Sequence, residues 1–340
     1  MMQTLEQLCA LAAPSGREET VREYVIARLE QSRAFCRWRV DPLGNLLVEV
    51  TGRQRAVRRV LFAAHMDEVG LIVTGVTEDG YLRFTAVGGI SPDVLFGQRV
   101  RIGQTPGVIG GKAIHQCRGD EREKIPETLL IDVGAPDRAA AERLVQPGDV
   151  AVFDQPAVSM GTVWRARAID DRAGCALLLH LLEQQPEYDF SAAFTVQEEV
   201  GLRGAGTAAF SLQPEVAVVL DATTAADTAF VPEEQQVCRV GGGPVVSFMD
   251  RRTLYDPALY AYIRRTAQEA GLPSQTKTKV AGGNDAGAIQ GAGAGARVAA
   301  VSLPCRYIHS PCCAVLPQDM EDTLALLRLL ADRLPGEPTL

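Results

Sequence analysis

The chain has 340 residues and a net charge of −8, with 46% hydrophobic and 22% charged residues. This composition is typical of a globular protein, and the length predicts one large domain plus a smaller one. The acidic balance argues against nucleic acid as a partner, because nucleic acid requires a basic face. No apolar run approaches the ~18 residues that cross a bilayer, so no membrane association is expected.

The 8 cysteines show neither a CxxC spacing nor a finger-like spacing with histidine. In a chain of this size they are typical of thiols in a reducing cytosol, so we expect a cytoplasmic location. The adjacent pair Cys312 and Cys313 is expected to be structural. Residues 1–13 carry Glu6 and no basic region, which favours a short amphipathic helix over a signal peptide.

The first 69 residues predict a helix followed by strands. Ser15 and Glu18 have the spacing of a capping box, and the apolar residues that follow recur at helical spacing. Strands are expected around residues 38–40, 46–50 and 60–64.

Between residues 70 and 157 the pattern changes to short β-like segments separated by Gly, Pro and Asp turns. We expect strands at 71–76, 81–87, 99–102, 129–133 and 150–153, and one helix at about 139–145. This pattern predicts a small β-barrel inserted into the larger domain.

After residue 158 the α/β alternation returns. Helices are expected at 171–184, at 257–270 and along a C-terminal stripe from Met320 to Leu334. Nearly continuous apolar strands, as in a buried parallel sheet, are expected at 192–196 and 216–220. Residues 291–296 match a loose dinucleotide fingerprint, but the apolar run 297–303 after them indicates a strand, which argues against nucleotide binding. The predicted fold is therefore α/β, with a mixed sheet flanked by helices.

Acidic or histidine residues follow or precede five separate apolar stretches. In order along the chain they are His65 with Asp67, Asp170 with Asp171, Glu198 with Glu199, Asp221, and His309. Ligands of open α/β sheets bind outside the carboxyl ends of the strands, so these side chains are expected to converge in one crevice. The sequence therefore predicts a two-metal hydrolase.

Each of these groups has a structural interpretation when it is taken alone. Burying two carboxylates without compensation costs several kcal/mol, to an order of magnitude, and a pair of divalent cations would remove that cost. Because neighbouring strand residues point to opposite sides, Glu198 and Glu199 need a local turn to act together. Otherwise one is expected to be a metal ligand and the other a general base. Asp170 and Asp171 are not distinguished by these arguments.

Five ordered motifs resemble the M42 metallopeptidases, the glutamyl and leucyl aminopeptidases, some of which were once labelled endoglucanases. The motifs are HMDEVG (65–70), AIDDRAGC (168–175), VQEEVGLRGA (196–205), GGNDAG (282–287) and RYIHSP (306–311). The resemblance also includes residues 87–99 in the insertion. It implies a zinc-peptidase-like catalytic domain over residues 1–69 and 158–340, with an inserted β-domain over 70–157.

The resemblance also implies a role for each matched residue. His65 and Asp221 would hold one metal, Glu199 and His309 a second, with Asp170 bridging them. Asp67 would orient the His65 ring, and Glu198 would be the general base. Two divalent ions are implied, zinc or cobalt and alternatively manganese. Peptides are the implied substrates, and the insertion implies a homo-oligomer such as the tetrahedral dodecamers of the family.

Other functions fit the sequence less well. A two-metal deacylase that acts on N-acylated amino acids is the nearest alternative. A glycosidase gives no role to His65 or His309, and a decayed scaffold is not expected where every ligand position is filled. Two departures from the family pattern leave substrate preference open: Cys312-Cys313-Ala314, where an acidic residue is common, and Ile90-Ser91, where Trp-Asp is frequent. His180 is expected to be structural, and His115 is expected to be structural or to contact another subunit.

Overall fold

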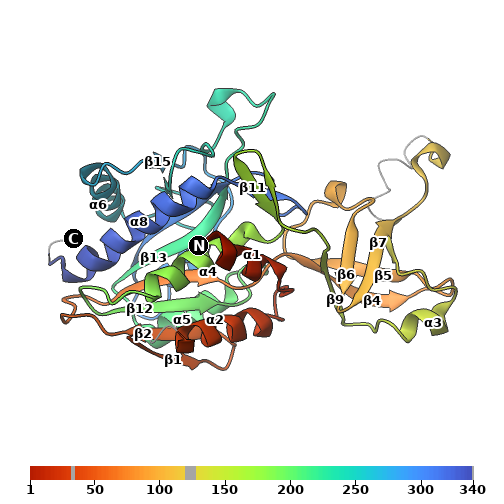
Figure 1. The fold of residues 1–340 in the computed structure, drawn as a ribbon, viewed down its shortest axis with the longest axis horizontal. Helices are drawn as coiled ribbons and strands as arrows, with labels where there is room; N and C mark the ends of the chain where they lie inside the picture. The colour runs from red at the N-terminus through yellow and green to blue at the C-terminus, as the bar shows by residue number, and fades with distance from the viewer. Residues whose placement is uncertain (32–34, 119–127, 339–340) are drawn as a thin grey trace.

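The computed structural model describes residues 1–31, 35–118 and 128–338 and has two lobes (Figure 1). The larger lobe is built on an 8-stranded sheet with the order β1-β2-β12-β3-β13-β16-β14-β15. Its strands are β1 (Cys36–Val40), β2 (Leu46–Val50), β3 (Val60–His65), β12 (Phe190–Thr195), β13 (Val216–Thr224), β14 (Val245–Val246), β15 (Gln275–Thr276) and β16 (Arg297–Cys305).

The four central strands of this sheet, β12, β3, β13 and β16, run parallel to one another, whereas β2 pairs with β12 and β14 pairs with β16 in antiparallel register. The sheet is therefore mixed, as the sequence predicts. Parallel central strands place their carboxyl ends at one edge, and that edge carries the functional side chains.

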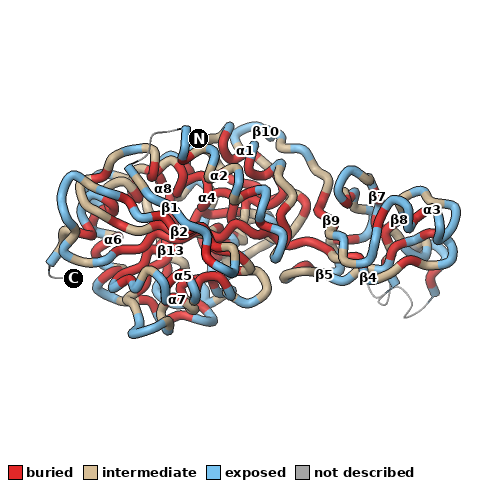
Figure 2. The backbone as a smooth tube through the Cα atoms, turned by 90° about the horizontal axis from the view of Figure 1, so that it is seen from below, coloured by how far each residue is buried: buried red, intermediate tan, exposed pale blue. Residues whose placement is uncertain are grey.

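Alternating residues of the strands form two cores on the two faces of the sheet. Phe62 and Phe194 face one core, which is covered by α1 (Met2–Ala10), α2 (Glu19–Gln31), α4 (Ile169–Leu182), α6 (Pro257–Glu269) and α8 (Pro317–Arg333). Leu61 and Ala193 face the other core, which is covered by α5 (Arg203–Leu212) and α7 (Ala286–Gln290). Figure 2 shows the buried strands at the centre of this lobe.

The smaller lobe is a closed barrel with the strand order β4-β5-β8-β7-β6-β9. Its elements are β4 (Gly70–Val76), β5 (Leu82–Val87), β6 (Arg99–Ile102), β7 (Thr105–Gly110), β8 (Leu130–Asp132), β9 (Val150–Phe153) and α3 (Arg138–Glu142). It encloses a core of its own that includes Leu71, Leu82, Val100 and Ile109. The barrel projects from the larger lobe beyond the carboxyl end of β3, which leads into β4 (Figure 1).

A small sheet of β10 (Val158–Met160), β11 (Val163–Ala166) and β17 (Cys313–Val315) lies between the two lobes. Short 3₁₀ helices in the described part of the chain include Pro92–Val94, Ile114–Gln116, Glu233–Gln235 and Leu334–Gly336.

Several predicted elements are confirmed with shifted bounds, and one prediction is wrong. The helix expected at 171–184 spans Ile169–Leu182, and residues 297–303 form part of the strand β16. The capping box at Ser15 is not formed. Instead, Ser15 donates a hydrogen bond to Asp67, and the carboxylate of Glu18 accepts one from the backbone of Gly16.

Phe62 lies at the centre of the larger core, fully buried, with its ring 5.2 Å from that of Phe190 in an edge-on contact. Phe62→Ala leaves a cavity, so we expect it to lower the free energy of unfolding by about 3–5 kcal/mol. The exposed Phe210 is the matched control, and Phe210→Ala should change stability by no more than about 0.5 kcal/mol. Denaturant unfolding of the three proteins measures both values; equal shifts would contradict the assignment of the core.

Candidate metal centre

The carboxyl ends of the central strands deliver most of the predicted side chains to one cavity. His65 is the last residue of β3, Asp221 lies in the last half of β13, and Asp170 lies at the start of α4. These residues line a cavity of about 160 Å³ together with Glu198, Glu199 and His309. Residues more than 240 positions apart in the chain, from His65 to His309, thus share one site.

A turn after β12 brings both glutamates to this cavity. The strand ends at Thr195, and Gln197 has a positive φ of 57°. The amides of Gly201 and Leu202 then donate to the carbonyl of Glu198. This is the local turn that the alternation of a strand requires if both carboxylates are to face one site.

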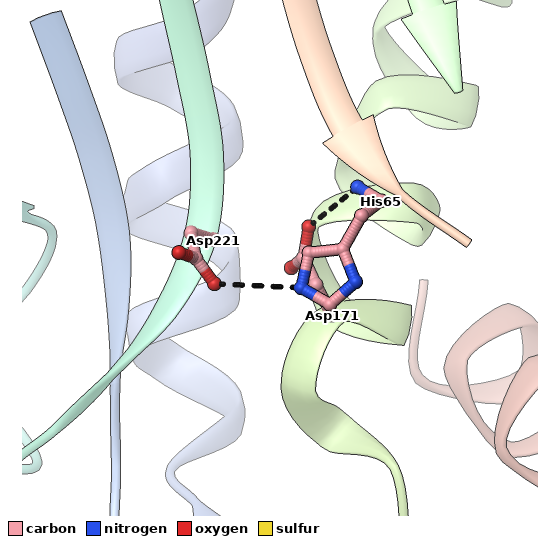
Figure 3. Close-up of side chains that lie close together, drawn as sticks. All are labelled: His65, Asp171 and Asp221. Atoms are coloured by element: carbon pink, nitrogen blue, oxygen red, sulfur yellow. Dashed lines mark hydrogen bonds and ion pairs between the residues drawn. The ribbon is translucent and has the colours of Figure 1, made fainter. Parts of the chain in front are cut away.

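The donor atoms fall into two groups, each with ligand atoms within 4.8 Å of one another. One group contains His65, Asp171 and Asp221 (Figure 3), and the other contains Asp170, Glu199 and His309. In the second group, His309 Nε2 lies 3.2 Å from Glu199 Oε1 and 3.3 Å from Asp170 Oδ2. Either group could hold a metal ion.

The two neighbouring aspartates have different surroundings. Asp170 lines the cavity, and its two oxygens face different histidines: Oδ1 is 3.3 Å from His65 Nε2 and Oδ2 is 3.3 Å from His309 Nε2. Asp171 is fully buried, and its oxygens accept hydrogen bonds from the backbone amides of His65 and Gly174. Asp170 therefore lies between the two groups, and Asp171 supports the backbone behind them.

Asp67 connects the parts of the site from behind. It is fully buried, with Oδ1 3.4 Å from His65 Nδ1. The same carboxylate accepts the backbone amides of Glu198 and Glu199 at 3.0 and 3.1 Å, and the Ser15 hydroxyl at 2.6 Å. The backbone carbonyl of Asp67 lies closer still to His65 Nδ1, at 3.2 Å. Asp67 thus orients both the imidazole and the turn that carries the glutamates.

The loop that carries His309 is held by the barrel and by an ion pair. His309 Nδ1 lies 2.8 Å from the carbonyl of Gly89, which follows the barrel strand β5, and this contact leaves Nε2 facing the acids. Earlier in the same loop, Arg306 makes a bidentate pair with Asp227 at 2.6 and 2.8 Å. A bidentate pair fixes direction as well as distance.

The electrostatics of the site reflect an excess of buried negative charge. Burial, reinforced by neighbouring acids such as Asp285, raises the pKa of Glu198 well above its usual range. Burial and the proximity of Asp170 do the same to the pKa of Asp221. Although burial opposes protonation of His309, its contacts with Asp170 and Glu199 raise its pKa to about 11. All three shifts favour protonation, which reduces the net negative charge of the site, and bound cations would reduce it in the same way.

The residues present fit divalent cations. Asp170 Oδ1 and Glu199 Oε1 are buried and make no hydrogen bond to any described residue. Buried polar atoms are almost always hydrogen-bonded, so two buried carboxylate oxygens that face histidine nitrogens without a hydrogen bond suit a site where a cation would lie between acid and imidazole. Imidazole and carboxylate donors suit zinc, cobalt and manganese.

Comparison with known proteins agrees with this arrangement. The family profile described as M42 glutamyl aminopeptidase matches residues 44–326. The chain belongs to the M42 peptidase family. It is therefore an aminopeptidase, a hydrolase that acts on peptides, from a family that uses divalent metal ions.

Aminopeptidases with different specificities resemble this chain to a similar degree. Glutamyl aminopeptidase of Lactococcus lactis is 32% identical over 90% of this chain and 88% of its own. Lysyl aminopeptidase of Pyrococcus furiosus is 31% identical over 87% of each chain. Among solved structures, the TET1 peptidase of Pyrococcus horikoshii superposes on this chain with a TM-score of 0.85 at 33% identity. The match covers 98% of this chain and 99% of that one. The TET1 peptidase can assemble into a tetrahedron or a large octahedral shell.

The other residues singled out from the sequence lie outside the candidate metal centre. His180 contacts Thr4 and Glu183 between helices, and His115 is exposed in a 3₁₀ turn. Cys313 is buried beside the His309 loop, and Cys312 accepts a contact from Arg165. Within the part of the chain that the structure describes, no helix is long and apolar enough to cross a membrane.

A buried ion network behind the candidate metal centre was missed from the sequence. Glu68 forms ion pairs with Arg167 and Arg172, and Arg172 Nη2 lies 3.2 Å from Glu68 Oε1. Arg172 also donates a hydrogen bond to the carbonyl of Met66. The only sequence signal is that charged residues occur inside the motifs 65–70 and 168–175, where apolar ones would be expected in a core. The network holds the backbone between His65 and Glu68.

Removing the negative partner of this network should be strongly destabilising. Glu68→Gln leaves two buried guanidinium groups uncompensated, so we expect a loss of about 3–5 kcal/mol in unfolding free energy at neutral pH. Glu6→Gln, at an exposed position, is the matched control.

The same variant has a predicted pH dependence. Burial opposes ionisation of Glu68, but Arg167 and Arg172 outweigh it and hold its pKa below the usual range. A carboxylate whose pKa is lower in the folded state stabilises the folded protein at pH values above its unfolded pKa of about 4.3. This contribution is lost as the pH falls through the folded-state pKa. The stability gap between wild type and Glu68→Gln should therefore narrow below about pH 4. Denaturant unfolding across pH measures the gap, and a constant gap would contradict the assigned charge.

Proposed function

We propose that this aminopeptidase binds two divalent metal ions and removes N-terminal residues from peptides, with Glu198 as the general base. The observation that carries the proposal is the position of Asp170, whose two carboxylate oxygens each lie 3.3 Å from a different histidine. A carboxylate placed between two ligand groups suits a bridge between two ions.

In this proposal the two donor groups divide the ligands. His65 and Asp221 would hold one ion, Glu199 and His309 would hold the other, and Asp170 would bridge them. The hydrogen bonds that Asp171 already makes to the backbone support assigning the bridge to Asp170. When bound, the two ions would polarise the scissile carbonyl and lower the pKa of an attacking water.

The residues around the ligands have separate tasks. The raised pKa of Glu198 suits a group that accepts a proton from water and passes it to the leaving amine. Asp67 would keep His65 Nε2 directed into the site and hold the backbone of Glu198 in place. Since Glu198 is 8% exposed, the proton transfer would take place largely shielded from bulk water.

A panel of substrates tests the activity against the nearest alternative. We expect zinc- or cobalt-loaded protein to cleave unblocked aminoacyl chromogenic amides and to leave their N-acetylated twins intact, with loss of activity on chelation and recovery on metal return. Cleavage restricted to the acetylated set would favour the two-metal deacylase instead. The similar enzymes include a glutamyl and a lysyl aminopeptidase, so the panel must contain acidic, apolar and basic residues.

The general base has its own test. Glu198→Gln keeps the size of the side chain but cannot accept the proton, so kcat should fall by at least about 10²–10⁴-fold. Metal content, measured by mass spectrometry, should stay at the wild-type value because Glu198 is not among the proposed ligands. Glu234→Gln, at an exposed position, is the control and should keep full activity. Near-normal turnover in Glu198→Gln would refute the role.

We further propose that residues 1–69 and 158–340 form the catalytic domain and that 70–157 form a domain for assembly. The barrel core is separate from the cores of the larger lobe, and a structurally similar peptidase assembles into closed shells. We therefore predict a homo-oligomer, of dodecamer size if it follows the tetrahedral relatives. Sedimentation at micromolar concentration should show this species, and a lone monomer would contradict the proposal.

A further inference from the structure

The cavity that contains the metal centre continues along the strand ends to a lysine. Beyond Asp221 its wall passes over Thr223 and Thr224 of β13 to Lys277, which follows β15. Among the described residues that line this cavity, Lys277 is the one lysine or arginine. It thus places a cation in a site that is otherwise acidic.

The ammonium group of Lys277 has donor capacity to spare. It is half-buried, and its Nζ donates to the carbonyl of Ala281 at 2.8 Å. An ammonium has three donors, and no ion pair of Lys277 with an acid occurs among residues 1–31, 35–118 and 128–338. A partly desolvated charge paired only with a carbonyl dipole favours an anion that arrives with a ligand.

The charge balance of the metal-loaded site points the same way. Four carboxylates line the cavity, from Asp170, Glu198, Glu199 and Asp221, and two divalent cations would compensate them. Lys277 would then leave its end of the cavity positive, and complementary charge both attracts and orients a substrate.

We propose that Lys277 binds a carboxylate of the peptide substrate and is a specificity-determining residue of this enzyme. The inference rests on the proposed aminopeptidase function. The carboxylate can come from the side chain of an N-terminal Asp or Glu or from the C-terminal carboxylate of a short peptide. A purely structural Lys277, which only holds the loop at Ala281, would not discriminate between substrates.

Paired substrates separate these roles. Lys277→Met should lower kcat/KM, mainly through KM, by about tenfold to a hundredfold for substrates that carry the carboxylate. Selective loss on glutamyl over leucyl chromogenic amides would identify the side-chain carboxylate. Selective loss on Ala-Ala over Ala-Ala amide would identify the C-terminal one. Lys277→Arg should restore most of the preference, and the exposed Lys279→Met, which makes the same change in net charge outside the cavity lining, should have no effect.

Two results would overturn the inference: an equal loss on every substrate, which indicates a structural role, or no change on any substrate. In both cases the wild-type enzyme still cleaves unblocked amides, so the proposed function stands. Failure of the wild type on all unblocked substrates would instead refute the proposed function, and this inference with it. Thermal unfolding of Lys277→Met checks that the variant is folded.

Discussion

The candidate metal centre depends on the hydrogen bonds of one buried carboxylate, that of Asp67. It lies two residues beyond His65 and accepts the amides of Glu198 and Glu199, so it connects the end of β3 to the turn after β12. Hydrogen bonds from the histidine and from Ser15 outweigh the effect of burial and keep the pKa of Asp67 below its usual range. Because it stays ionised, Asp67 can order three groups that come from separate parts of the chain.

Contacts from the barrel also position residues of the site. The barrel begins at Gly70, the last residue of the motif that contains His65 and Asp67, and the carbonyl of Gly89, after β5, lies 2.8 Å from His309 Nδ1. Gly88 has a φ of +86°, and a Cβ there would come within 2.9 Å of Val69 and 3.2 Å of Glu199. The close contact of this barrel loop with Val69 and Glu199 therefore requires glycine at this point, and the next residue, Gly89, holds His309.

Much of the fold and the converging side chains could be predicted from the sequence, because both follow from local pattern. Apolar runs that end in His65, Glu198 or Asp221 are strands, and parallel strands share an edge. Elements without such a pattern were missed: β7 within the barrel and the turn at Gln197, which depends on a positive φ in a non-glycine residue. The capping box at Ser15 was wrong because tertiary contact with Asp67 replaced the local one.

The exact partner of each side chain within the site could not be predicted from the pattern of residues. The order of Asp170 and Asp171 in the chain does not say which of the two accepts hydrogen bonds from backbone amides. In the structure Asp171 accepts them from His65 and Gly174, and Asp170 therefore faces the histidines. Lys277 belongs to a polar loop with no distinctive pattern. It reaches the cavity because β15 pairs with β14 and the amide of Lys277 donates to the carbonyl of Val246. Specificity in this family of sites is therefore harder to read from sequence than the metal ligands are.

The most direct test of this account is the anomalous scattering from crystals loaded with zinc or manganese. The account predicts two peaks per chain, one beside His65 and Asp221 and one beside Glu199 and His309, with Asp170 within about 2.0–2.2 Å of both. A single peak, or two peaks bridged by Asp171 while Asp170 stays unligated, would contradict it.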